Sequence, residues 1–248
     1  MPLHLRQICL ATGDLETTAA RLETVLGVAA CYSDPDVAQL GVRNRLFQIG
    51  TDFLELVSPL SPQAPLQRFL DRRGGDGGYM AITQTETREE QAAIRARAAE
   101  LGIRIAWELT HRGADFLQWN PADTGGSFVE TSFDHAGELD GCWSAAGGAI
   151  GAATPFRLAG IEVTTADPAR TAATWGALTG IAPDPDGGLH LRNARIGFVA
   201  AAGGAGGLTA LHLRSPEAGA ALSRAAAAGL EVADDSVTLC GLRLRITA

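Results

Sequence analysis

Two stretches of the chain share one sequence pattern. Residues 7–28 read QICLATGDLETTAARLETVLGV, residues 160–181 read GIEVTTADPARTAATWGALTGI, and the two segments align without gaps. An internal repeat limits the fold strongly, because each copy must form the same supersecondary unit. The shared positions are Asp14 with Asp167, Thr18 with Thr171, the two alanines that follow each of these threonines, and Gly27 with Gly180.

Each copy begins with the pattern of a strand followed by a helix. Apolar residues alternate with period two, an aspartate follows, and a helical stripe then ends at a glycine. In the first copy Asp14 suits the N-cap of the helix, and Gly27 suits a left-handed C-cap. The apolar stripe between them consists of Leu22, Val25 and Leu26.

Two weaker copies follow the same outline. Their helices are predicted at residues 88–101, ended by Gly102, and at residues 217–228, ended by Gly229. Short strand patterns follow every helix. They lie at 28–33, 45–49 and 53–57; at 104–111, 116–119 and 127–133; at 189–191 and 195–200; and at 237–239 and 242–246.

The repeated unit is therefore βαβββ, present four times, which predicts an α+β fold of tandem modules. Residues 145–154 are rich in Gly and Ala and are predicted to link two paired halves. The halves are residues 1–144, with two full modules, and residues 155–248, with two shortened modules.

Charge and composition restrict the partners. The formal net charge is -8 and the pI about 5.1, which argues against nucleic acid and anionic membranes. No apolar run is long enough to span a bilayer, and the N-terminus lacks the layout of a signal peptide. The four cysteines, at positions 9, 31, 142 and 240, form no close pair. Buried reduced thiols and a cytoplasmic location are the expectation.

Paired βαβββ modules that open with a strand, an Asp, a helix and Leu-Gly resemble the vicinal oxygen chelate superfamily. This superfamily includes glyoxalase I, methylmalonyl-CoA epimerase, extradiol dioxygenases and bleomycin-resistance proteins. The sharpest local matches are FLELVSP at 53–59 and NPADTGGSFVE at 120–130. The second resembles the loop of methylmalonyl-CoA epimerases that precedes a strand with a metal-ligating Glu.

The resemblance implies curled mixed sheets that form a cup around a metal ion. One residue from the first strand and one from the last strand of each module would hold the ion, typically His, Glu or Gln, His and Glu. The first-strand positions here are Gln7 and Tyr79, and the last-strand positions are Glu55 and Glu130. Of these, Gln7, Glu55 and Glu130 are the metal ligands that the resemblance predicts.

Strand alternation supports these positions independently. Ile8 and Leu10 are expected to face the helix, so Gln7 and Cys9 point to the opposite face. Leu54 and Leu56 turn Glu55 inward in the same way. A structural ion pair between Glu55 and Arg43 or Arg45 is the competing interpretation.

The chain departs from the superfamily pattern at both imidazole positions, which are Gln7 and Tyr79. The remaining all-oxygen set suits Mg, Mn or Ca better than Zn, and it leaves open whether any divalent cation is bound. Trp119 either lines the cleft or packs in the core. His111 and His135 are candidates only for the rim.

The second half keeps no such ligand set. Its equivalent positions are Gly160, Gly197, Gly207 and either Arg243 or Arg245, and Glu162 is the acid that alternation turns inward. We therefore expect residues 155–248 to complete or support the fold.

Two functions stay open at this level. In the first, the chain is an isomerase or lyase acting on a small oxygen-rich metabolite. Glu130 or Glu55 would be the general base, and Gln7, Tyr79, Trp119 and Cys9 would bind the substrate. In the second, it is a metal-free protein that binds or sequesters a small molecule. The sequence decides neither the substrate nor whether the chain is a monomer or a homodimer.

Overall fold

The computed structural model describes residues 3–136, 154–201 and 206–248. The predicted linker at 145–154 lies outside the described residues, apart from Thr154. Within the described residues no helix is long and apolar enough to cross a membrane.

The first module departs from the prediction at one strand. Residues 28–33 form no strand there; only Tyr32 makes an isolated bridge, to Leu46. The chain instead turns into a short 3-10 helix, which the N-cap Asp34 opens. The elements are β1 His4–Ala11, α1 Leu15–Leu26, η1 Pro35–Leu40, β2 Val42–Ile49 and β3 Asp52–Pro59.

The second module contains the helix predicted at 88–101. A further helix, α2 at Pro65–Arg73, precedes this module, and the sequence patterns did not predict it. The elements of the module are β4 Gly77–Thr85, α3 Arg88–Leu101, β5 Ile105–His111, β6 Ala114–Trp119 and β7 Phe128–Asp134.

The second half repeats the outline, with strands of only two residues at β9 and β12. Its elements are β8 Arg157–Thr165, α4 Pro168–Thr179, β9 Leu189–His190, β10 Arg195–Ala200, β11 Gly207–Arg214, α5 Ala218–Ala227, β12 Val232–Ala233, β13 Ser236–Leu239 and β14 Leu242–Thr247.

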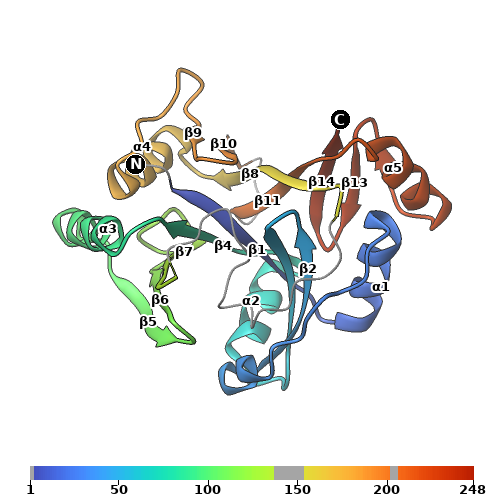
Figure 1. The fold of residues 1–248 in the computed structure, drawn as a ribbon, viewed down its shortest axis with the longest axis horizontal. Helices are drawn as coiled ribbons and strands as arrows, with labels where there is room; N and C mark the ends of the chain where they lie inside the picture. Colours follow the sequence, from blue (N-terminus) through green and yellow to red (C-terminus); the bar gives the residue numbers. More distant parts are fainter. Residues whose placement is uncertain (1–2, 137–153, 202–205) are drawn as a thin grey trace. The chain divides into compact units, whose positions relative to one another are not determined.

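These strands form two mixed seven-stranded sheets (Figure 1). The strand orders are β2-β3-β1-β4-β7-β6-β5 and β12-β13-β14-β11-β8-β10-β9. Neighbours such as β2 and β3 are antiparallel, whereas β4 with β7 and β8 with β10 are parallel. The predicted α+β fold of tandem βαβββ modules is confirmed.

The sequence repeat is also a repeat in geometry. Asp14 caps α1 by accepting the Thr17 N–H at 3.1 Å, and Asp167 caps α4 by accepting the Arg170 N–H at 3.0 Å. The C-cap glycines of both helices are left-handed, with φ of 69° and 77°. A threonine pair recurs as well, because the Thr12 and Thr18 hydroxyls lie 2.8 Å apart and those of Thr165 and Thr171 lie 2.9 Å apart.

The chain divides into two compact units. The first unit comprises Met1–Gln7, Met80–Gly148 and Gly160–Leu208, and the second comprises Ile8–Tyr79, Ala149–Ala159 and Thr209–Ala248. In the first unit α3 packs beside α4, and in the second α1 packs beside α5 (Figure 1). Burial of apolar helix stripes against strands holds each unit together.

Candidate functional site

Glu55 on β3 is the centre of a buried polar cluster in the second unit. Its side chain is only 7% exposed. The Cys9 thiol donates to Oε2, and the Asn44 amide donates to Oε1 at 2.6 Å. Both carboxylate oxygens therefore accept hydrogen bonds from neutral donors, an arrangement that a buried carboxylate needs in order to stay in place.

Backbone geometry brings these three side chains together. β3 lies between β2 and β1 in the sheet, so a residue on β3 has neighbours from both strands. Asn44 on β2 and Cys9 on β1 supply those neighbours. The amide of Asn44 is oriented by its other end, because Oδ1 accepts the Asp34 N–H at 2.8 Å. Its NH2 group must then point at Glu55.

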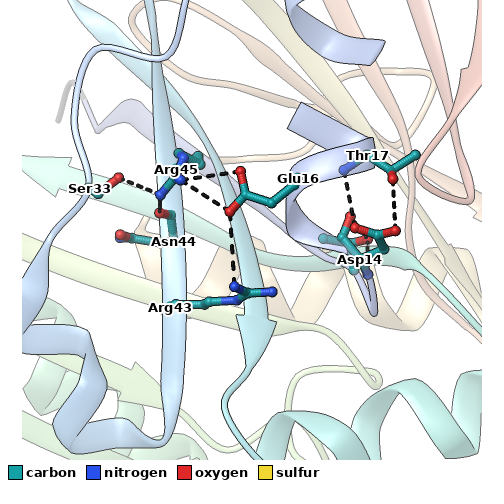
Figure 2. Close-up of polar contacts among 8 residues, drawn as sticks. Asp14, Glu16, Thr17, Ser33, Arg43, Asn44 and Arg45 are labelled. Atoms are coloured by element: carbon teal, nitrogen blue, oxygen red, sulfur yellow. Dashed lines mark hydrogen bonds and ion pairs between the residues drawn. The ribbon is translucent and has the colours of Figure 1, made fainter. Parts of the chain in front are cut away.

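Arg43 and Arg45, the two possible ion-pair partners of Glu55, contact Glu16 instead. Arg45 contacts the Glu16 carboxylate at 3.1 Å, and Arg43 reaches it at 4.0 Å. Figure 2 shows both guanidinium groups directed at Glu16, at the start of α1. Asn44 lies between them on β2, so alternation turns its side chain to the face that carries Glu55.

Tyr79 on β4 completes the cluster. Burial is the main cause that raises the pKa of its phenol to about 12, and electrostatic interactions with Cys9 and Glu55 act in the same direction. The ring packs edge-on against Phe69, with centroids 5.0 Å apart. Because this pKa is far above neutral, the Tyr79 hydroxyl keeps its proton and can donate a hydrogen bond.

Glu130 on β7 is held in a similar way in the first unit. It is 3% exposed, and the Gln118 amide donates to Oε2 at 2.8 Å. Gln118 lies directly opposite Glu130 in the register of β6 and β7. Glu55 and Glu130 thus each accept a hydrogen bond from a side-chain amide on the adjacent strand. The sequence analysis missed both amides, since strand register decides which side chains are neighbours.

The remaining predicted residues lie in the first unit. Gln7 is buried on β1. Trp119 is fully buried, and its indole N–H donates to the Thr131 hydroxyl at 3.0 Å. The structure therefore groups Cys9, Glu55 and Tyr79 in the second unit and places Gln7, Trp119 and Glu130 in the first.

The PADTGG motif forms a firmly held turn. Asp123 accepts from the Arg104 guanidinium at 2.8 and 2.9 Å, and these hydrogen bonds lower its pKa to about 2. The Thr124 hydroxyl donates to the Ser127 carbonyl at 2.7 Å, and the Trp175 indole donates to the Thr124 carbonyl at 2.9 Å. The polar side chains of the motif shape the loop that leads into the strand of Glu130.

A groove of about 320 Å³ lies between α3, β5 and β6 in the first unit. Arg88 there contacts Asp115 at 2.7 Å, and Arg95 pairs with Glu108. His135, a rim candidate from the sequence, lies 3.1 Å from Asp115. The charges that line this groove thus neutralise one another.

The carboxylates proposed to hold a divalent cation are hydrogen-bonded to protein side chains in this structure. Such a cation needs several oxygen ligands turned toward one point. Glu55 instead directs its oxygens at Cys9 and Asn44, and Glu130 accepts from Gln118. Across 3–136, 154–201 and 206–248, no three His, Cys, Asp or Glu side chains gather as metal ligands would. The ligand set implied by the resemblance stays a prediction.

Comparisons with known proteins identify the family. A mutant of 4-hydroxymandelate synthase from Streptomyces coelicolor aligns with 92% of this chain and 76% of its own, with a TM-score of 0.72 and 14% identity. Methylmalonyl-CoA epimerase in complex with methylmalonyl-CoA and NH4+ aligns with 56% of this chain and 99% of its own, with a TM-score of 0.48 and 20% identity. Methylmalonyl-CoA epimerase from Mycobacterium tuberculosis aligns with 53% of this chain and 87% of its own, with a TM-score of 0.46 and 23% identity.

The similarity to 4-hydroxymandelate synthase shows that the two chains share a fold. The TM-scores of the two epimerases are below 0.5, and no conclusion is drawn from them. The search of curated proteins finds no match. The family model for the glyoxalase-like domain matches residues 8–179, more than half of the chain. The chain therefore belongs to the glyoxalase-like domain family of the vicinal oxygen chelate superfamily.

Proposed function

We propose that this protein binds a small oxygen-rich metabolite at the Glu55 cluster and moves a proton at a carbon next to a carbonyl, as an isomerase or a lyase. One observation carries the proposal. The buried Glu55 carboxylate is oriented by Cys9 and Asn44, and it interacts electrostatically with the Tyr79 phenol, which keeps its proton. Such a pairing of a base with a hydrogen-bond donor suits carbon-acid chemistry.

The proposed step balances within the cluster. The C–H bond of the substrate breaks, Glu55 takes the proton, and the electron pair moves onto the carbonyl oxygen. The Tyr79 hydroxyl donates a hydrogen bond to that oxygen as its charge grows. An isomerase then returns the proton to carbon, whereas a lyase expels a leaving group from the neighbouring carbon. Glu130 is the alternative base, held by Gln118.

The hydrogen bonds to Glu55 explain how it could act as a base while buried. An ionised carboxylate has about four acceptor sites, so two donors leave lone pairs for a proton from the substrate. The donors also hold the side chain in one orientation, which removes the need to order it during the reaction.

Metal assistance is a separate prediction from the superfamily. Gln7, Glu55 and Glu130 would be the ligands, with Mg, Mn or Ca favoured over Zn by their oxygen donors. Elemental mass spectrometry of the purified protein after dialysis against each metal tests it. A stoichiometric metal that is lost in Glu130→Ala supports the prediction, and less than a tenth of a metal per chain contradicts it.

A metal-free binding protein is the second candidate function. The observation in its favour is the aromatic pair that Tyr79 of the Glu55 cluster forms with Phe69. A carboxylate flanked by aromatic rings suits an amine or another organic cation. Such a protein would bind its ligand without chemical change.

Exchange of carbon-bound hydrogen in D2O separates the two functions. A panel of a 2-oxo acid, a 3-oxo acid and a 2-methylmalonyl thioester is incubated with the protein, and NMR follows the loss of the proton next to the carbonyl. An enzyme catalyses exchange in at least one compound, and Glu55→Gln abolishes it while the fold is kept. Glu16→Gln, on an exposed carboxylate of α1, is the matched control and keeps full activity. No exchange in any compound contradicts the enzymatic proposal.

A further inference from the structure

Helix α2 joins the two strands that supply Glu55 and Tyr79. It spans Pro65–Arg73, directly between β3 and β4. Its buried residues Leu66 and Leu70 pack against Ala11 and Val57. The helix that connects the two strands therefore also packs back onto them.

The face that α2 covers is the face of the Glu55 cluster. Side chains two residues apart on a strand point to the same side of a sheet. Ala11 is two residues from Cys9, and Val57 is two residues from Glu55. The partly buried residues that join this contact are Val42, which is two residues from Asn44, and Phe69 with Tyr79. The helix thus closes one end of the polar cluster with an apolar layer.

α2 is a short helix without a side-chain N-cap. Its N-cap residue Ala64 makes no side-chain hydrogen bond, which is also true of Glu217 at α5, whereas Asp14, Thr87 and Asp167 cap α1, α3 and α4. Only Leu66 and Leu70 of its nine residues are buried. A short helix with little buried surface and an open first turn has a low free energy of local opening.

Two glycines follow the helix. Gly74 and Gly75 have φ of 80° and 143°, and a Cβ at either position would meet no atom within 4 Å. These backbone angles favour glycine. The N–H groups of Gly74 and Gly75 donate to the Leu70 carbonyl at 2.9 and 3.0 Å, so the C-terminal end of α2 is held while its N-terminal end has no side-chain cap.

We propose that α2 is a lid on the Glu55 site that opens from its uncapped N-terminal end, and that the ligand which lifts it carries an apolar group. With α2 closed, Cys9, Asn44 and Glu55 are all buried. A ligand that displaces the helix must replace its apolar contacts with Ala11, Val57 and Tyr79. An apolar group beside the carbonyl would recover that buried surface. The ligand assignment rests on the proposed function, whereas the lid stands on packing alone.

Reactivity of the Cys9 thiol tests the lid without a ligand. Native protein is treated with iodoacetamide, and mass spectrometry follows labelling of the Cys9 peptide. Leu70→Ala weakens the underside of the lid and is expected to speed Cys9 labelling at least tenfold. Ala64→Ser supplies the missing N-cap and is expected to slow it several-fold. Leu22→Ala, a buried truncation on α1, is the matched control.

The lid is overturned by either of two results. In one, Cys9 is labelled at the wild-type rate in both Leu70→Ala and Ala64→Ser. In the other, Leu22→Ala speeds labelling as much as Leu70→Ala, because exposure of Cys9 would then follow general unfolding. Failure of the D2O exchange experiment leaves these rates unchanged, so the two proposals fail separately.

The apolar group is tested with two neutral ketones that differ by one phenyl ring. 4-Phenylbutan-2-one is expected to protect Cys9 from labelling at concentrations where butan-2-one does not. Equal protection by both ketones, or protection by neither, overturns the apolar-ligand part of the proposal.

Discussion

The Asn44 amide donates to Oε1 of Glu55 at 2.6 Å while its own oxygen accepts the Asp34 N–H at 2.8 Å. This double role makes Asn44 the residue that orients the carboxylate. The amide cannot rotate without breaking both bonds, so Glu55 has a fixed donor on one oxygen and the Cys9 thiol on the other. Four predictions concern this cluster and other capped or buried groups of the chain.

Replacing Asn44 by Leu keeps its size and removes the donor. Glu55 then loses a charge-assisted hydrogen bond inside the protein, which we expect to lower the free energy of unfolding by about 2 kcal/mol. Urea denaturation measures the change. Arg43→Ala, at the exposed neighbouring position, should change the stability by less than about 0.5 kcal/mol. A loss for Asn44→Leu no larger than that of the control would contradict the orienting role.

Thr87 is the N-cap of α3, and its hydroxyl accepts the Glu90 N–H at 3.2 Å. Thr87→Ala leaves that N–H without its side-chain acceptor, so we expect a loss of about 1 kcal/mol in the free energy of unfolding. Thr87→Ser retains the hydroxyl and should recover most of the loss. Thermal or urea unfolding of the three proteins measures this, and equal stability of Ala and Ser variants would count against the cap.

Titration of Tyr79 provides a direct test of its burial. The chain has two tyrosines, so a Tyr32→Phe variant isolates the Tyr79 phenol. Absorbance at 295 nm should show its ionisation at a pKa of about 12 rather than 10. Glu55→Gln removes one of the negative charges and should move that pKa downward. Ionisation near 10 in the folded protein would show that the ring is solvated.

Cys240 is expected to make the stability depend on alkaline pH. Burial, followed by the charge of Asp76, raises the pKa of its thiol from 9.0 to about 12. Between these values the unfolded chain has released the proton and the folded chain has kept it. Stability therefore falls as the pH rises from about 9 to about 12 and is unaffected by this group below 9. Urea midpoints at pH 8, 9.5 and 11 should fall less steeply in Cys240→Ser than in the wild-type protein.

Much of the fold follows from local physical chemistry in the sequence. The repeated Asp14 and Asp167 mark two N-caps, and Gly27 and Gly180 mark two left-handed ends, because capping depends on residues within one turn. The family model confirms the superfamily that these repeats resemble. Helix α2 was missed since its PLQRFLDRR sequence is polar and short, and its stability depends on Ala11 and Val57 from distant strands.

The candidate site, too, was predictable from the sequence in some features and not in others. Alternation within single strands is local, so the sequence alone determined that Cys9 and Gln7 share one face of β1 and that Glu55 alternates with Leu54 and Leu56. Which side chains meet across strands is not local, because a shift of one residue in register replaces every neighbour. Only the tertiary structure could therefore show Asn44 beside Glu55, Gln118 opposite Glu130, and α2 packed on the face of the cluster.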